Sequence, residues 1–173
     1  NVSDLIYPVF ITDKNNSENI ELMPDIKRLC MNDLIHTAEK LVSHGIHAIA
    51  LFPVIDKKYK SINGEEAYKS DGLIQKTIAI LKSEFPELLV ITDIALDPYT
   101  THGQDGIIDA NNYVTNDKTI QILKKQALSH AEAGADIVAP SDMMDGRIGA
   151  IRTELEKNNF HNTLILSYAA KYA

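Results

Sequence analysis

The sequence has a single cysteine, no tryptophan and fewer basic than acidic side chains. Cys30 alone forms neither an internal disulfide nor a multi-thiolate metal site, which indicates a reducing compartment. Seventeen Lys and Arg against 24 Asp and Glu give a net charge of -7, which argues against a nucleic-acid binder because phosphate contacts need a basic face. No apolar run approaches the roughly 20 residues of a membrane span, and the polar start 1–4 lacks a signal-peptide pattern. We therefore expect a cytoplasmic protein that binds neither nucleic acid nor membrane.

Short apolar runs alternate with longer amphipathic ones over the 173 residues, a length that suits one domain. The apolar runs predict strands at 5–11, 46–54, 88–94, 135–140 and 163–168. The amphipathic runs predict helices that begin at the N-cap Asn32 and end at Gly45, and that cover 72–85, 117–133 and 147–158. The segments 12–21 and 56–71 are polar and predict loops.

Strands that are apolar on both faces and alternate with helices pair in parallel through right-handed crossovers. This α/β pattern fits either an open doubly wound sheet or a (β/α) barrel, and the pattern alone leaves both open. Five strands suffice for the first and are three short of the second. The chain begins without Met and stops at Ala173, just past its fifth predicted strand. We therefore expect 1–173 to be a single incomplete domain from a longer gene product.

Polar side chains follow the predicted strands at their carboxyl ends, where parallel sheets bind ligands. Those after the third strand are Asp93, Asp97, Tyr99, His102 and Asp105. Those after the fourth and fifth are Ser141, Asp142, Asp145, Arg147, Tyr168 and Lys171. A neutral lysine amine attacks carbonyl groups to form a Schiff base. Carboxylates move protons or hold a hard cation such as Mg²⁺.

Several of these residues also have an ordinary structural explanation. Asp117 and Asp142 are of a type common at N-caps and in turns, and His102 is of a type that bonds loop backbone. Lys171 taken singly is a solvated terminal lysine. No glycine-rich nucleotide loop, Walker loop or paired-cysteine motif is present in the sequence, so nucleotide binding has no support.

Arg147 either begins a helix or pairs with Asp145 or with a substrate carboxylate. The pair Met143-Met144 is typical of core packing. The remaining histidines show no metal-ligand spacing and are expected at the surface or at helix ends: His36, His44, His47, His130 and His161.

Three longer strings lie at the carboxyl ends of these strands: DIALDPYTTHGQDG at 93–106, APSDMMDGR at 139–147 and SYAAKYA at 167–173. Shorter strings precede them, LIYPVF at 5–10, MP at 23–24, ALFPV at 50–54 and EAY at 66–68. In this order and spacing they resemble the porphobilinogen synthase family, also called 5-aminolevulinate dehydratase. The resemblance spans essentially the whole chain.

The resemblance implies a (β/α)₈ barrel, of which this chain corresponds to about the first five β/α units, in a homo-octamer. Enzymes of this family are lyases that condense two molecules of 5-aminolevulinate into porphobilinogen with loss of two waters. Porphobilinogen is the pyrrole from which heme and other tetrapyrroles are made. By resemblance, Lys171 matches one of two Schiff-base lysines, Ser141 an active-site serine and Asp93 a strand-end aspartate. The second lysine, the substrate-carboxylate arginines, the lid and the allosteric Mg²⁺ glutamate would fall beyond Ala173. Substrate-binding or supporting roles are expected for Tyr99, His102, Asp145, Arg147 and Tyr168.

One departure concerns the metal. Zinc-dependent members of the family place three cysteines after the third strand, where this chain has Ala95, Asp97 and Asp105. Hard oxygen ligands in place of thiolates disfavour zinc, and the chain resembles the aspartate-type, Mg²⁺-responsive subgroup. Asp97 and Asp105 would assist proton transfer, orient the substrate amine or bind a weakly held cation, and the sequence leaves these three roles open.

Two other functions stay open. A half barrel with open strand edges tends to aggregate or to pair, so 1–173 taken alone would be a catalytically inert folding or assembly piece. The acidic strand ends, with Ser141 and Lys171, also loosely match a Mg²⁺-binding module that receives phosphate.

Overall fold

The computed structural model describes residues 1–171. Within them, seven strands form one sheet in the order β2-β3-β1-β4-β5-β6-β7. The strands are β1 (Ile6–Thr12), β2 (Glu18–Ile20), β3 (Met23–Leu29), β4 (Ala48–Val54), β5 (Leu89–Ile94), β6 (Ile137–Pro140) and β7 (Leu164–Ile165). The α-helices are α1 (Met31–Ser43), α2 (Leu73–Glu84), α3 (Asn116–Glu132) and α4 (Arg147–Lys157). Short 3₁₀ helices are η1 (Val2–Asp4), η2 (Lys57–Tyr59) and η3 (Glu65–Tyr68).

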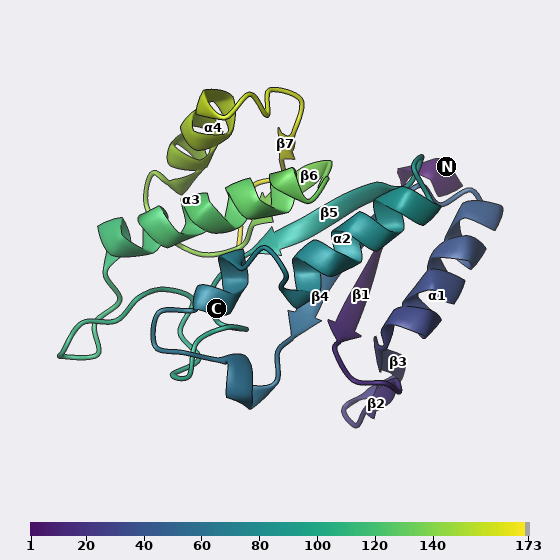
Figure 1. The fold of residues 1–173 in the computed structure, drawn as a ribbon, viewed down its shortest axis with the longest axis horizontal. Coiled ribbons are helices and arrows are strands. Elements are labelled where there is room, and N and C mark those ends of the chain that lie inside the picture. Colours follow the sequence, from purple (N-terminus) through teal and green to yellow (C-terminus); the bar gives the residue numbers. More distant parts are fainter. Residues whose placement is uncertain (172–173) are drawn as a thin grey trace.

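The strands β1, β4, β5, β6 and β7 pair in parallel in chain order, and a helix lies between each consecutive pair along the chain. Figure 1 shows α1, α2 and α3 on one face of the sheet. The α/β class with parallel pairing is therefore confirmed. Since parallel strands share their direction, the carboxyl ends of β5 and β6 meet at one edge, with Asp93 beside Ala139 and Ile94 beside Pro140.

The two faces of the sheet belong to different clusters of buried side chains. Along β4, Ile49 and Leu51 are fully buried in a cluster with residues of α1 and α2. Ala48 and Ala50, which alternate with them, belong to a separate small cluster with residues of β5 and β6. Because successive strand residues point to opposite faces, Ile49 and Leu51 support the helices, whereas Ala48 and Ala50 lie on the other face beside Ile91.

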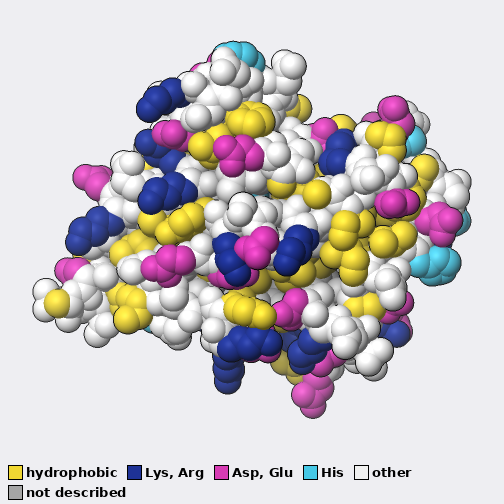
Figure 2. Space-filling model, viewed as in Figure 1, with side chains coloured by type: hydrophobic (Ala, Val, Ile, Leu, Met, Phe, Trp, Pro, Cys, Tyr) yellow, Lys and Arg dark blue, Asp and Glu magenta, His cyan; other side chains and the backbone are white. Residues whose placement is uncertain are grey.

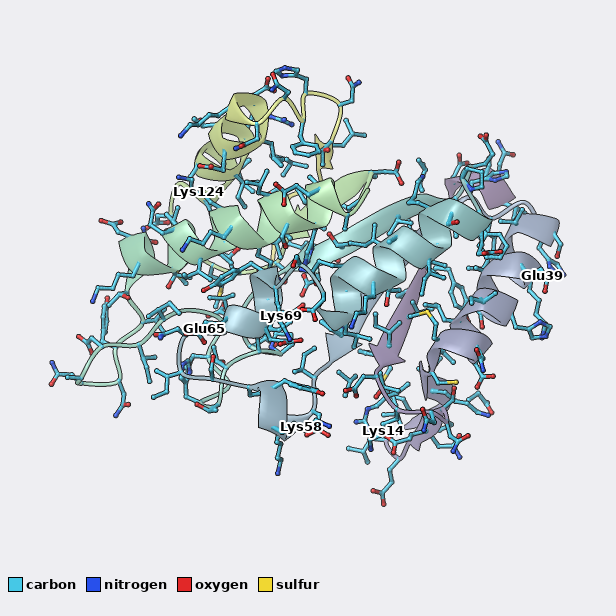
Figure 3. The ribbon with its side chains drawn as sticks, viewed as in Figure 1. Lys14, Glu39, Lys58, Glu65, Lys69 and Lys124 are labelled. Carbon is cyan, nitrogen blue, oxygen red and sulfur yellow. The ribbon has the colours of Figure 1, made fainter. Side chains whose placement is uncertain are left out.

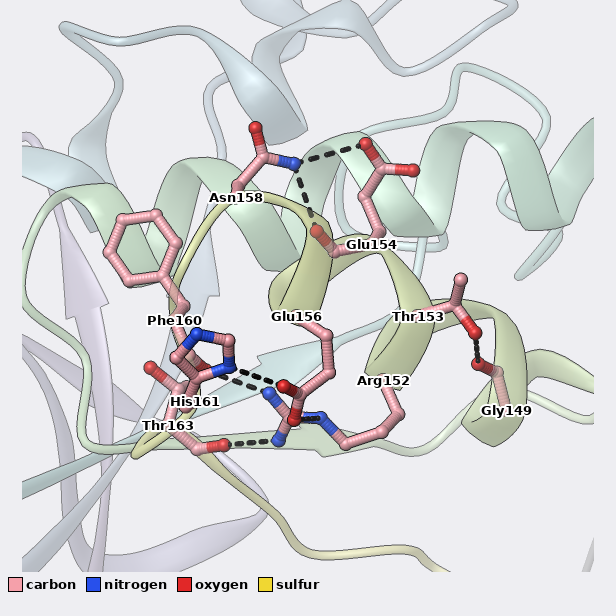
Figure 4. Close-up of polar contacts among 9 residues, drawn as sticks. All are labelled: Gly149, Arg152, Thr153, Glu154, Glu156, Asn158, Phe160, His161 and Thr163. Carbon is pink, nitrogen blue, oxygen red and sulfur yellow. Dashed lines mark hydrogen bonds and ion pairs between the residues drawn. The ribbon is translucent and has the colours of Figure 1, made fainter.

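Arg152 fixes the turn between α4 and β7. Its guanidinium donates to the carbonyls of Thr163 and Phe160, both at 2.7 Å, and its Nε lies 2.9 Å from Glu156 (Figure 4). A second link ties α4 to α3, where Nζ of Lys124 lies 2.9 Å from the carboxylate of Glu154. Together these contacts set where the chain enters β7.

The opposite edge of the sheet, at the amino ends of β5 and β6, is held by an ion pair. Nζ of Lys82, in the last turn of α2, lies 3.0 Å from Oδ2 of Asp136. The same oxygen accepts the N–H of Val90 at 2.8 Å, and Lys82 also donates to the carbonyl of Leu88 at 3.1 Å. Both charged side chains are mostly buried, so the pair joins helix and strands away from the polar loops.

The β2–β3 hairpin was not predicted. The segment 12–21 contains β2, and β3 lies where the sequence predicts no element. Most of β3 is exposed. It pairs with β1 at two positions only, where Arg28 lies beside Phe10 and Leu29 beside Ile11. A strand with so little burial shows no apolar alternation, and Pro24 and Asp25 within it are residues that strands disfavour.

Two boundaries also differ from the prediction. Helix α1 begins at Met31 with Cys30 as its N-cap, so Asn32 lies inside the first turn. The fifth predicted strand, 163–168, is reduced to β7, although the N–H groups of Leu166 and Tyr168 still donate to carbonyls of β6 at 3.0 and 3.2 Å. The other predicted elements agree with the structure within two residues.

Charged side chains of both signs are interspersed over the helical face of the molecule (Figure 2). Lys14, Glu39 and Lys58 are among the exposed side chains that Figure 3 labels. Among residues 1–171, no helix has the length and apolarity needed to span a membrane.

The central strand supports a stability prediction. Leu51→Ala removes a fully buried side chain and is expected to lower the free energy of unfolding by about 2–5 kcal/mol, because the vacated space does not refill. Leu22→Ala is the matched control, since Leu22 is 91% exposed, and we expect a change below about 0.5 kcal/mol. Urea denaturation measures both, and equal losses would contradict the assigned core.

Candidate active site

Three segments converge at the carboxyl ends of β5, β6 and β7. Asp93 is the second-last residue of β5, and Ser141 follows β6 directly. The N–H of Ser141 donates to the carbonyl of Ile94 at 3.2 Å, which links the two strand ends. The Lys171 ammonium donates to the carbonyl of Ser141. The structure therefore brings together the lysine, the serine and the aspartate that the sequence singled out.

Asp93 is the most perturbed carboxyl group of the three segments. It is partly buried, and among the described residues its Oδ1 has no hydrogen-bond partner. Burial raises the pKa of Asp93 to about 6, with a further rise from the charge of Asp97, while hydrogen bonding by Ser141 and the charge of Lys171 oppose the rise. A carboxyl group with this pKa exchanges a proton readily near neutrality.

Asp97 and Asp105 stand further out in the loop after β5. Partial desolvation raises the pKa of Asp97, and so does the charge of Asp105, while Lys171 and Lys60 lower it. Within residues 1–171 no group of three or more His, Cys, Asp or Glu side chains is arranged to hold a metal ion. Asp97 and Asp105 offer carboxylate oxygens and no thiolate, a donor set that suits a hard cation better than zinc.

A cavity of about 430 Å³ opens beside Asp93 and Asp97, on the face of the sheet away from the helices. Its lining combines aromatic residues of β1 and β4 with two carboxylates and two cations, including Phe10, Phe52, Arg28, Lys60, Asp93 and Asp97. The space suits a small molecule that carries both an amine and a carboxylate.

The loop after β6 is fixed by its own side chains. Asp142 is fully buried, accepts the N–H of Met144 at 2.8 Å and pairs with Nε of Arg147 at 3.1 Å. The turn role considered for Asp142 is therefore confirmed. Arg147 begins α4, as one of the two interpretations of it predicted. The alternative pairing with Asp145 is wrong, because the Arg147 side chain turns inward to Asp142 and to the carbonyl of Met144 at 3.0 Å.

Asp145 and the two methionines take different positions. The Asp145 side chain is exposed, and its backbone exchanges hydrogen bonds of 2.8 and 3.3 Å with the side-chain amide of Asn116. Met144 is buried in the core as predicted, whereas Met143 is 56% exposed. The backbone of Asp145 thus anchors the loop to the start of α3, and neither Asp145 nor Arg147 faces Asp93.

The three other residues with expected supporting roles lie in different surroundings. His102 accepts the N–H of Gln104 at Nδ1 (3.2 Å), and its Nε2 lies 3.1 Å from the carbonyl of Ile62, so its ring serves the loop backbone. Tyr99 is 2% exposed and packs in the core beneath the site. Tyr168 is 38% exposed, and burial together with the charge of Asp93 raises its pKa. The charge of Asp93 raises the pKa of both tyrosines, and of the two only Tyr168 is exposed to solvent.

The family model described as Delta-aminolevulinic acid dehydratase matches residues 1–173. The chain belongs to the delta-aminolevulinic acid dehydratase family. A relative in Methanothermus sociabilis is 51% identical over 171 residues, which cover 98% of this chain and 52% of that protein. A chloroplastic relative in Arabidopsis thaliana is 44% identical over 99% of this chain and 40% of its own length.

A crystal structure of delta-aminolevulinic acid dehydratase from Toxoplasma gondii, in complex with the product porphobilinogen, matches with a TM-score of 0.98 and 46% identity. The match covers 99% of this chain and 49% of that one. The α/β sheet therefore corresponds to part of a barrel enzyme of this family. The chain spans about half the length, or less, of the relatives it matches.

Two buried polar residues beneath this dehydratase-family site were missed. His130 was expected at the surface or at a helix end, yet it is fully buried, with Nδ1 3.0 Å from Oγ1 of Thr92, and burial lowers its pKa to about 3. Gln126 is equally buried one turn earlier in α3. Their spacing of four residues, with Leu123 and Ala127, marks one helix face and was the available signal. The other four histidines of the group are exposed, in keeping with the prediction.

The raised pKa of Asp93 makes stability depend on pH. The folded protein binds the Asp93 proton more tightly than the unfolded chain, so this stabilisation is present below about pH 4 and is lost as pH rises through about 6. Relative to the wild type, Asp93→Asn should therefore gain up to about 3 kcal/mol of unfolding free energy between about pH 4 and pH 7. Denaturation of the full-length protein at several pH values measures this, with the exposed Asp71→Asn as charge control. A pH-independent difference would contradict the assignment.

Proposed function

We propose that the full-length protein is a porphobilinogen synthase, a lyase that condenses two molecules of 5-aminolevulinate into porphobilinogen and two waters. Membership of the dehydratase family supports this proposal. The observation that carries it is the convergence of Lys171 and Ser141 with the desolvated carboxyl of Asp93. The product complex of the Toxoplasma gondii relative gives the matching chemistry in that protein.

In this proposal the Lys171 amine attacks the ketone carbon of one substrate molecule, and the carbonyl oxygen leaves as water to give a Schiff base. Asp93 alternates between its acid and base forms near neutrality and moves the protons of that step. Asp97 and Asp105 attract the substrate ammonium group, and Ser141 and Tyr168 position the reacting molecule. The second substrate molecule would bind a second lysine supplied by sequence outside 1–173, so residues 1–173 alone would be inactive.

We also propose that the protein belongs to the aspartate-type, Mg²⁺-responsive subgroup. The oxygen side chains of Asp97 and Asp105 and the buried methyl group of Ala95 support this, because they offer no thiolate to zinc. A hard cation at this edge would stabilise negative charge, and the main Mg²⁺ site would lie outside this chain. A homo-octamer in the cytoplasm completes the proposal, with the single reduced Cys30 as its support for the compartment.

Borohydride trapping tests the role of Lys171. The full-length protein is incubated with 5-aminolevulinate, reduced, and mapped by peptide mass. We expect a stable increment on Lys171, because reduction converts the Schiff base into an amine that does not hydrolyse. Lys171→Ala should lose this increment and lower kcat more than about a thousandfold, the scale for removal of a covalent nucleophile. The exposed Lys118→Ala is the control.

The outcomes of this experiment test the proposed reaction and the role of Lys171 separately. A wild-type protein that forms no porphobilinogen contradicts the proposed reaction. A protein that forms it without an increment on Lys171 keeps the reaction and removes the lysine from it.

Metal exchange tests the subgroup. We expect chelation with EDTA to lower activity, Mg²⁺ to restore it and Zn²⁺ not to, because carboxylates prefer hard cations. The double variant Asp97→Cys/Asp105→Cys supplies thiolates at the same two positions and should gain bound zinc, measured by elemental analysis. Stoichiometric zinc in the unsubstituted protein would contradict the assignment.

A further inference from the structure

The turn that separates Asp93 from Asp97 contains a backbone carbonyl that depends on a distant side chain. The carbonyls on either side of it accept backbone N–H groups. The carbonyl of Ala95 accepts instead from Nε2 of Gln126, at 3.3 Å. Gln126 lies in the middle of α3, 31 positions along the chain, so the contact ties the turn to the rigid helix beneath it.

The other end of this amide faces the same loop. Oε1 of Gln126 and the hydroxyl of Tyr99 are both buried, and within residues 1–171 neither forms a hydrogen bond of ordinary geometry. The two groups are nevertheless neighbours. Burial raises the pKa of Tyr99, and the Gln126 side chain is close enough to lower that pKa in part. One amide thus contacts the loop at two points, at the start of the turn and just after Asp97.

We propose that Gln126 is a positioning residue that sets the distance between the carboxylates of Asp93 and Asp97. This inference rests on the proposed function, in which those two carboxylates move protons and attract the substrate amine. Gln126 does not contact the substrate, since it is fully buried on the helix side of the sheet.

The physical reason is that a buried carbonyl without a donor is unstable. If the amide of Gln126 is removed, the Ala95 carbonyl must turn toward another donor or toward water. The turn then shifts, and Asp97 moves relative to Asp93, which is fixed in β5. A displacement of about 1 Å in catalytic groups costs roughly a hundredfold in rate.

The test compares two buried glutamines in the full-length protein. Gln126→Met removes the amide and keeps the length of the side chain. Gln75→Met is the matched control, because Gln75 is also buried in a helix and donates to the carbonyl of Ala67 at 3.1 Å and to Ser129 at 2.8 Å, outside the site. The measurements are kcat, KM, the pH profile of kcat and the thermal midpoint.

We expect both variants to lose thermal stability to a similar degree, whereas kcat falls about ten- to hundredfold in Gln126→Met alone. The acidic limb of its pH profile should also move, because the mutual repulsion of the two carboxylates depends on their distance. Equal kcat values and pH profiles in the two variants would overturn the proposal. If the wild-type protein itself forms no porphobilinogen, the proposed function is overturned instead.

Gln126→Glu keeps the test informative if Gln126→Met does not fold. The protonated carboxylic acid of this variant has the shape of the glutamine amide and donates to the same carbonyl, whereas the ionised carboxylate does not. We expect kcat near the wild-type value at the acidic end of the profile and a reversible decline as pH rises, beyond that of the wild type. A profile parallel to that of the wild type would contradict the role of the donated hydrogen bond.

Discussion

Parallel pairing between β5 and β6 is the constraint on which the whole site depends. It places Asp93 beside Ala139 and brings the N–H of Ser141 onto the carbonyl of Ile94. Because side chains alternate along a strand, a slip of one residue would turn Asp93 to the helix side. The ammonium of Lys171 reaches the carbonyl of Ser141 only where the chain beyond β7 continues along β6. Asp93 and Lys171 are 78 positions apart in the chain. They come together through backbone register rather than through a contact between their own side chains.

Two carboxyl groups near this edge differ in how their negative charge is compensated. Burial raises the pKa of both Asp93 and Asp142. Asp142 is compensated by Arg147 and by the N–H of Met144, so its charge stabilises a loop. For Asp93, burial raises the pKa to about 6 against hydrogen bonding by Ser141 and the charge of Lys171, so this carboxyl group takes up a proton near neutrality.

The sequence alone could predict the elements that bury a full face. The apolar strands at β4, β5 and β6 and the amphipathic helices were found, and the strand-end rule located Asp93, Ser141 and Lys171. The β2–β3 hairpin was not found because it buries little, and His130 was misplaced because polar residues on a buried helix face are paired only in three dimensions. The inward turn of Arg147 likewise depends on where Asp142 lies, which spacing along the chain does not determine.

The ion pair of Lys82 and Asp136 lies at the amino ends of the strands, where Asp136 accepts the N–H of Val90, three positions before Asp93. One ion pair thus holds the amino ends of the strands, whereas the carboxylates of the candidate site lie at the carboxyl ends. Neither Lys82 nor Asp136 is among the groups that shift the pKa of Asp93. A substitution in this ion pair should therefore change stability and leave the proton affinity of Asp93 as it is.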